Sequence, residues 1–123
     1  MMQVKGIHHC SVLVADTERS FAFYHGVLGL EIDCSRPDLG YPGAWLVAGA
    51  QQIHLLELKD EGAGCNDGHG GRDRHIALMV DKLDPLRRVL EKEGIDYTMS
   101  RSGRQALFCR DPDGNTLEFI ASV

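Results

Sequence analysis

The chain alternates between short apolar runs and one longer helical pattern in each of its halves. In the first half, β-branched and apolar residues predict a strand over residues 7–14. Phe21, Tyr24 and Leu28 share one face of a helix predicted over residues 17–28, which ends before Gly29. Two more strands are predicted over residues 44–48 and 52–58.

The second half shows the same order of elements. After a strand predicted over residues 74–80, Asp84 and Pro85 are typical of a helix N-cap and first helical position, and Gly94 marks the helix end. Three strands follow, over residues 97–99, 105–110 and 116–121, with a turn at residues 111–114 before the last. Both halves are therefore interpreted as βαβββ modules, although the second strand of the first half is not clearly marked.

A nearly constant spacing relates the two halves. His9 to His75 is 66 positions, Gly29 to Gly94 and Gly49 to Gly114 are each 65, and His54 to Glu118 is 64. Such a repeat usually brings equivalent positions together about a local axis. The alternative is coincidence, since strand–helix–strand order is common. We predict an α+β fold in a single domain of residues 1–123, with modules at about residues 4–60 and 72–123.

Charge and composition exclude several classes of partner. The chain has 13 Lys and Arg against 18 Asp and Glu, a formal net charge of −5, so it lacks the basic field that binds nucleic acid or an anionic membrane. No segment approaches the roughly 18 apolar residues of a membrane helix, and the first residues do not resemble a signal peptide. We therefore expect a cytoplasmic protein. Its four cysteines are spread singly, which is typical of reduced, buried thiols.

His8 and His9 are neighbours on the first predicted strand, and only one of them can point into a shared cavity. Alternate residues of a strand face opposite sides of the sheet. The repeat selects His9, because it is the counterpart of His75 in the second half. His8 is then interpreted as an exposed or edge histidine.

The same rule separates His54 from Glu57, which cannot both face inward on a regular strand. His54 is the counterpart of Glu118, and each lies between two large apolar residues. A lone polar group on a buried stretch costs several kcal/mol unless something satisfies it, and a metal ion would satisfy these groups together. Glu57 is left with the role of a charge at the strand end.

His9, His54, His75 and Glu118 therefore form a candidate metal site of three imidazoles and one carboxylate. This donor set suits Zn²⁺, Ni²⁺, Co²⁺, Fe²⁺ or Mn²⁺ better than Ca²⁺ or Mg²⁺, which prefer oxygen ligands. Histidine-rich sites that leave positions open are catalytic more often than structural. The alternative is that the four are unrelated core or surface residues.

Four arginines are candidates for binding a carboxylate or phosphate of a substrate. They lie beside a glycine-rich segment at residues 59–74, which could close over a substrate, and in the later Arg-Ser-Gly-Arg turn. The candidates are Arg72, Arg74, Arg101 and Arg104. For any one of them, an ordinary surface arginine is the alternative.

Three motifs resemble those of the vicinal oxygen chelate superfamily, which includes glyoxalase I, fosfomycin-resistance transferases, extradiol dioxygenases and bleomycin-resistance proteins. They are the opening His-Cys-Ser-Val-Leu-Val-Ala-Asp of residues 9–16, the middle His-Ile-Ala-Leu-Met-Val-Asp of residues 75–81, and the closing Asp-Pro-Asp-Gly-Asn-Thr-Leu-Glu of residues 111–118. The resemblance spans nearly the whole chain.

The resemblance implies that the two modules form a cupped, partly open mixed sheet around a metal held by His9, His54, His75 and Glu118. It also implies a homodimer, as chains of this size in the family usually dimerise. One position departs from the pattern. The four ligand positions of bacterial glyoxalase I resemble His, Glu, His and Glu in this order, whereas the second of them in this chain is His54. The exchange makes a metal site about one charge more positive and removes a candidate base.

The implied function is a metal-dependent lyase, isomerase or transferase that chelates vicinal oxygens of a small substrate. It would stabilise an enediolate or similar anion, with Glu118 or a metal-bound hydroxide as the catalytic base. A transferase version would use a thiol such as glutathione. The alternatives are a non-catalytic protein that sequesters a drug or metabolite, as bleomycin-resistance proteins do, and an Fe(II) dioxygenase.

Overall fold

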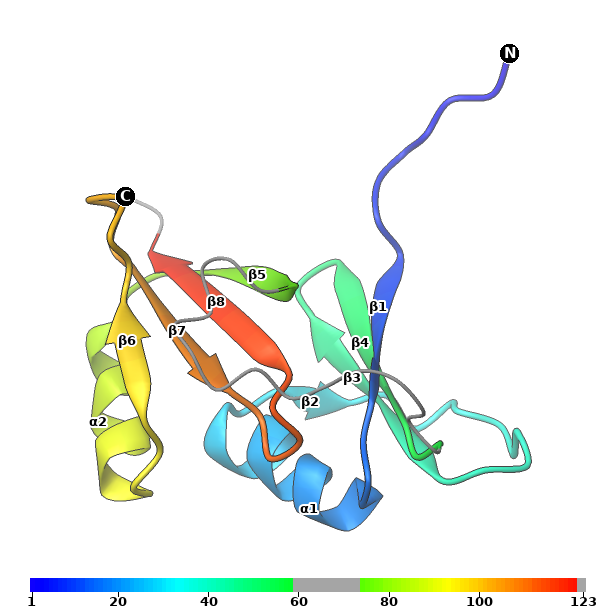
Figure 1. Ribbon diagram of the computed structural model, residues 1–123. Coiled ribbons are helices and arrows are strands. Elements are labelled where there is room, and N and C mark those ends of the chain that lie inside the picture. The colour runs from blue at the N-terminus through cyan, green and yellow to red at the C-terminus, as the bar shows by residue number, and fades with distance from the viewer. Residues whose placement is uncertain (59–73, 122–123) are drawn as a thin grey trace.

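The computed structural model describes residues 1–58 and 74–121. The first module comprises β1 (His9–Leu13), α1 (Thr17–Phe21), the π-helix η1 (Ala22–Val27), β2 (Glu31–Ile32), β3 (Gly43–Ala48) and β4 (Gln51–Leu56). The second comprises β5 (His75–Val80), α2 (Asp84–Lys92), β6 (Tyr97–Met99), β7 (Ala106–Arg110) and β8 (Thr116–Ala121) (Figure 1). The predicted order of two βαβββ modules is confirmed.

Each module forms one open, mixed sheet of four strands. The strand orders are β1-β4-β3-β2 and β5-β8-β7-β6, with the first pair parallel and the others antiparallel. The register repeats as well, because Ser11 lies opposite His54 in one sheet and Ala77 lies opposite Glu118 in the other. The repeat in the sequence is therefore a repeat of structure.

Three local features differ from the sequence-based prediction. The unmarked strand is β2, whose two residues are too few for a period-two pattern. The first helix changes to π-helical geometry after Phe21, and the N–H of Leu28 donates to the carbonyl of Phe23. The second helix begins at Asp84 with Leu83 as its N-cap, because Leu83 is buried and already has helical dihedral angles.

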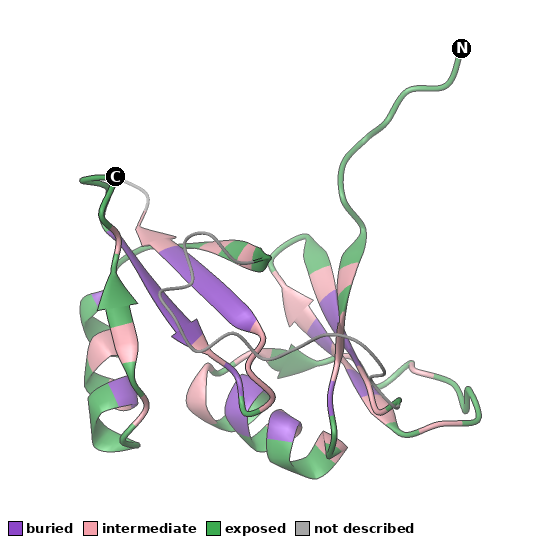
Figure 2. Cartoon of the chain, in the orientation of Figure 1, coloured by how far each residue is buried: buried purple, intermediate pink, exposed green. Residues whose placement is uncertain are grey.

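One hydrophobic core is shared by both modules. Figure 2 shows that buried residues concentrate on β4, β7 and β8 and that each helical segment carries a few of them. The cluster joins Leu46, Ile53 and Leu55 of the first module with Leu107 and Leu117 of the second. Because separating the modules would expose these side chains to water, the hydrophobic effect opposes their separation.

A buried hydrogen bond ties η1 to the turn between β7 and β8. The hydroxyl of Tyr24, which is fully buried, donates to Asp111 Oδ2 at 2.9 Å. Burial raises the pKa of Asp111 above its ordinary value, although hydrogen bonds from Asn115, Tyr24 and the Asp113 backbone oppose that rise. Burial, followed by the charge of Asp111, raises the pKa of Tyr24, so this hydroxyl keeps its proton.

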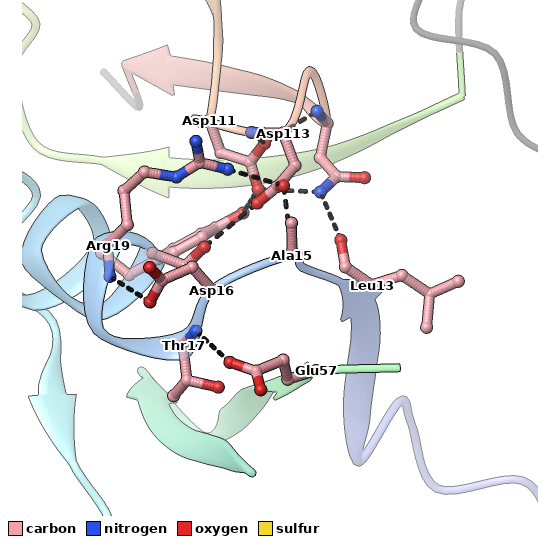
Figure 3. A network of polar contacts seen from close by, with 11 residues as sticks. Leu13, Ala15, Asp16, Thr17, Arg19, Glu57, Asp111 and Asp113 are labelled. Carbon is pink, nitrogen blue, oxygen red and sulfur yellow. Dashed lines mark hydrogen bonds and ion pairs between the residues drawn. The ribbon is translucent and has the colours of Figure 1, made fainter. Parts of the chain in front are cut away.

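Further polar contacts surround that hydrogen bond (Figure 3). Asp113 accepts hydrogen bonds from Ala15 N at 3.0 Å, Ser20 Oγ at 3.1 Å and Arg19 Nη2 at 2.9 Å. Asn115 Nδ2 donates to the Leu13 carbonyl at 3.1 Å, and Glu57 Oε1 accepts from Thr17 N at 2.7 Å at the start of α1. The contacts of Asp113 and Asn115, together with the shared core, fix how the two sheets sit against each other. In the described residues, no helix has the length and apolar character that a membrane crossing requires.

Candidate metal centre

The first module brings His9 and His54 into contact. Both face the same side of their sheet, because His9 lies two residues before Ser11, which is opposite His54. Their rings stack with centroids 3.9 Å apart and an interplanar angle of 12°. His54 is 8% exposed, whereas His9, on the edge strand β1, is exposed. His8 is also exposed, as predicted, and its Nδ1 lies 2.8 Å from His9 Nδ1.

Two residues that sequence reasoning missed complete the surroundings of His54. Trp45, directly opposite His54 on β3, stacks on its other face with centroids 4.5 Å apart. Gln52 Oε1 lies 2.8 Å from His54 Nε2, and Gln52 Nε2 donates to Asp33 Oδ2 at 2.7 Å. The period-two rule places Gln52 on the same face as His54, so this signal was present in the sequence.

The surroundings of His54 favour its neutral form. Burial lowers the pKa of His54 below its ordinary value of 6.5, and positive charge on His9 and His8 lowers it further. Asp33 is ionised near neutral pH, because hydrogen bonds from Ser35 and then from Gln52 lower its pKa. A neutral imidazole is the form that binds a metal ion.

The second module brings His75 and Glu118 into contact. His75 Nε2 lies 3.1 Å from Glu118 Oε1, and Arg104 Nη2 lies 3.3 Å from Glu118 Oε2. Glu118 is 2% exposed, in a strand buried on both faces, and Phe108 packs edge-on against His75 with centroids 5.5 Å apart. A buried carboxylate is costly without partners, and in this chain an arginine and a histidine supply them.

The predicted arginines have different positions. Arg104 contacts Glu118 while 59% of its side chain remains exposed, and Arg101 and Arg74 are exposed. Arg72 and most of the glycine-rich segment lie outside the described residues. Of the predicted arginines, Arg104 is thus brought to a predicted ligand, Glu118.

The structure brings the four predicted ligands together as two pairs and does not form one group of four. Within residues 1–58 and 74–121, no three His, Cys, Asp or Glu side chains are close enough together to hold a metal ion. The predicted site of four ligands around one metal therefore stays a prediction, because the described residues show two pairs. The shared core and the hydrogen bond from Tyr24 to Asp111 hold the two sheets in a relative position that the repeat in the sequence does not specify.

Each pair nevertheless fits half of a divalent metal site. The donors of each pair face one side of one sheet, and each pair contains one buried member, His54 or Glu118. Neutral imidazole and carboxylate are donors that first-row transition metals bind. The ligand role of the four residues stays a prediction.

Two open mixed sheets, each carrying a pair of donors in the same register, define a two-module class of α+β protein. The chain belongs to the Glyoxalase/Bleomycin resistance protein/Dioxygenase superfamily, whose family model matches residues 6–119. The resemblance seen in the sequence motifs is therefore confirmed at the level of the superfamily.

Relatives with known names are distant. Glyoxylase I 4 of Arabidopsis thaliana is 33% identical over 124 residues, covering 95% of this chain and 71% of the relative. Lactoylglutathione lyase of Haemophilus influenzae is 29% identical over 122 residues, covering 93% of this chain and 90% of the relative. These similarities establish homology to enzymes of the superfamily and leave the specific activity of this chain to be tested.

Solved structures share the fold over nearly the whole chain. A protein from Bacillus anthracis assigned to the glyoxalase family has a TM-score of 0.83 at 26% identity, covering 100% of this chain and 99% of that chain. The fosfomycin resistance protein FosX of Listeria monocytogenes, complexed with Mn(II) and a dihydroxypropylphosphonic acid, has a TM-score of 0.76 at 15% identity, covering 98% and 95%. At 15% identity, the likeness to FosX concerns the fold alone.

Proposed function

We propose that this protein is a metal-dependent enzyme of glyoxalase type that acts on a small molecule with two adjacent oxygens. The observation that carries the proposal is the matched pair of donors at equivalent register in the two sheets, with one member of each pair buried. A binding protein without chemistry has no need to bury His54 and Glu118, each between two large apolar neighbours. The names of the relatives support the same class of reaction.

The complete site is proposed to form between two copies of the chain. His9 and His54 of one copy would join the partner's His75 and the partner's Glu118. A two-fold dimer uses each surface twice, so two such sites would form per dimer. This proposal is supported by the separation of the pairs within one chain. It is also supported by β1 and β5, each an edge strand of its sheet.

The four donors would hold a divalent transition metal, which supplies a Lewis acid for the two substrate oxygens. Glu118 is proposed as the base that takes a proton from the carbon next to the substrate carbonyl. Its burial keeps water away from the carboxylate and strengthens its electrostatic interactions. Arg104, largely exposed and 3.3 Å from Glu118, can offer its outer N–H groups to a substrate carboxylate or phosphate. Glutathione is the proposed thiol where the reaction needs one.

Equilibrium metal binding tests the proposal directly. Protein prepared without a histidine tag is expected to bind close to one transition metal ion per chain, and His54→Ala should lose that binding. His25→Ala is the matched control, because His25 lies on η1 and bonds the Leu30 carbonyl instead. Absence of metal binding in the unmodified protein would favour the drug- or metabolite-binding alternative.

A second measurement tests the role of Glu118. With glutathione and a 2-oxoaldehyde, lactoylglutathione formation by Glu118→Gln should fall about 100- to 10,000-fold in kcat, with a smaller change in KM. Glu31→Gln, at an exposed position of β2, serves as the control. Full activity in a fully metallated Glu118→Gln variant would refute the assignment of this residue as base. Consumption of O₂ by the Fe(II)-loaded protein would instead favour a dioxygenase.

A further inference from the structure

Three polar side chains form a hydrogen-bonded chain on the sheet face that carries His9 and His54. Asp33 Oδ2 accepts from Gln52 Nε2 at 2.7 Å, and Gln52 Oε1 lies 2.8 Å from His54 Nε2. Asp33 is itself held firmly, because its Oδ1 accepts from Ser35 N at 2.9 Å and from Ser35 Oγ at 2.7 Å. The chain therefore begins at an anchored carboxylate and ends at the ring of His54.

The chemistry of the three groups fixes the direction of both hydrogen bonds. An ionised carboxylate only accepts hydrogen bonds, so the amide group of Gln52 that faces Asp33 must be its NH₂. The other end of the amide, its carbonyl oxygen, then faces His54 and must accept a proton from Nε2. His54 is thereby held as the tautomer with hydrogen on Nε2 and a lone pair on Nδ1.

Aromatic neighbours hold the plane of the same ring. His54 is stacked between Trp45 and His9, with interplanar angles of 11° and 12°. Stacking fixes the ring plane but does not distinguish one ring nitrogen from the other. The hydrogen bond to Gln52 supplies that distinction, so stack and hydrogen bond together determine where the lone pair of Nδ1 lies.

We propose that Gln52, held by Asp33, is a positioning residue that prepares Nδ1 of His54 to bind the metal ion. The inference rests on the proposed function. The second module supplies an internal comparison, because Thr116 occupies the register position that Gln52 occupies in the first. The ligand beside Thr116 is Glu118, a carboxylate that has no tautomer to select, and the Thr116 hydroxyl is bonded to Arg110 Nη1 at 2.6 Å. The amide of Gln52 is thus found in the module whose proposed metal ligand on the central strand, His54, is an imidazole.

The first test measures the tautomer of His54 in the metal-free protein by nitrogen-15 NMR. Gln52→Met keeps the length of the side chain but removes its acceptor, and should convert His54 from the Nε2–H form to a mixture of tautomers. The double variant Gln52→Glu/Asp33→Asn, which retains an acceptor for His54 and a hydrogen bond between positions 33 and 52, should keep the Nε2–H form. Gln51→Met is the matched control, since Gln51 is exposed and points to the opposite face. An unchanged tautomer in Gln52→Met would overturn the proposal.

The second test measures Ni²⁺ affinity through quenching of Trp45, the single tryptophan of the chain. Gln52→Met should weaken Ni²⁺ binding about 10- to 100-fold, as is typical when the outer partner of a histidine ligand is removed. The double variant Gln52→Glu/Asp33→Asn should restore most of the affinity, and Gln51→Met should not lose it. His54→Ala separates the two levels of inference: if it binds Ni²⁺ like the unmodified protein, the proposed metal site fails. If it loses binding while Gln52→Met does not, only the positioning role fails.

Discussion

Two inactive variants should restore metal binding to each other when they are mixed, if each site is shared between two copies. His54→Ala removes a donor of the first-module pair, and Glu118→Ala removes a donor of the second-module pair. Each variant alone has only defective sites. In a mixed dimer, the two defects fall in the same site, and the other site receives an intact pair from each copy.

The proposed arrangement of pairs sets the size of this effect. After subunit exchange, equal amounts of the two variants give about half mixed dimers. Each mixed dimer has one intact site of two, so about a quarter of the original metal binding should return. The assay is Ni²⁺ or Co²⁺ binding after mixing, with subunit exchange followed by native mass spectrometry. The same fraction of enzymatic activity should return with it.

A second mixture controls for nonspecific recovery. His9→Ala and His54→Ala both damage the first-module pair, so every site of their mixed dimer lacks one donor and no binding should return. Recovery in this control as well as in the first mixture would contradict the assignment of pairs. Absence of recovery in the first mixture, with exchange demonstrated, would refute a site shared between copies.

Four further predictions concern the fold and the donor set. Tyr24→Phe removes the buried hydrogen bond to Asp111 and should lower the free energy of unfolding by about 1–3 kcal/mol in urea denaturation. Burial raises the pKa of Asp111 above 3.8, so the folded state holds the proton of this carboxyl more tightly than the unfolded chain does. The free energy of unfolding, relative to that of Asp111→Asn, should therefore decrease as the pH rises from about 4 through the folded-state pKa. Urea titrations at several pH values measure this decrease. Burial raises the pKa of Cys109 to about 12, so alkylation of the native protein followed by peptide mass spectrometry should modify the exposed Cys34 and leave Cys109 free. His54→Glu should shift metal preference from Ni²⁺ toward Mn²⁺ in competition binding, since it exchanges a nitrogen donor for oxygen.

The two modules and the faces on which their strand residues lie could be predicted from sequence, because local rules determine them. Period-two alternation identified the face on which His54 and Glu118 lie, and their burial at 8% and 2% agrees with their apolar neighbours. The turn positions were visible for a similar reason. The paired glycines Gly29 and Gly94 have φ angles of 77° and 69°, a region that favours glycine over other residues.

The surroundings of His54 could be predicted only in part. Gln52 was identifiable as a neighbour on the same face, but its bond to Asp33 depends on β2, a strand of two residues with no alternation to detect. The contact with Trp45 depends on the register of β3 against β4, which places the two residues directly opposite each other. Sequence spacing within one strand does not determine this register.

The angle between the two sheets is the feature that the repeat could not supply. Repetition requires that each module present an equivalent pair, but it does not require that the two pairs of one chain meet. The relative position of the two sheets depends on the shared core and on contacts between the modules such as the hydrogen bond from Tyr24 to Asp111.

The four proposed metal donors differ in burial, and this difference indicates which edges of the sheets a second copy would cover. In each pair, the donor on the central strand is buried, whereas its partner, His9 or His75, is exposed on a strand at the edge of the sheet. An enzyme that keeps bulk water from a reactive metal needs both members enclosed. In the proposed dimer, the covering surface would meet the edges formed by β1 and β5, because the exposed members lie on these strands. A second copy that sets its β5 beside β1, and its β1 beside β5, would enclose both pairs with the same contact used twice.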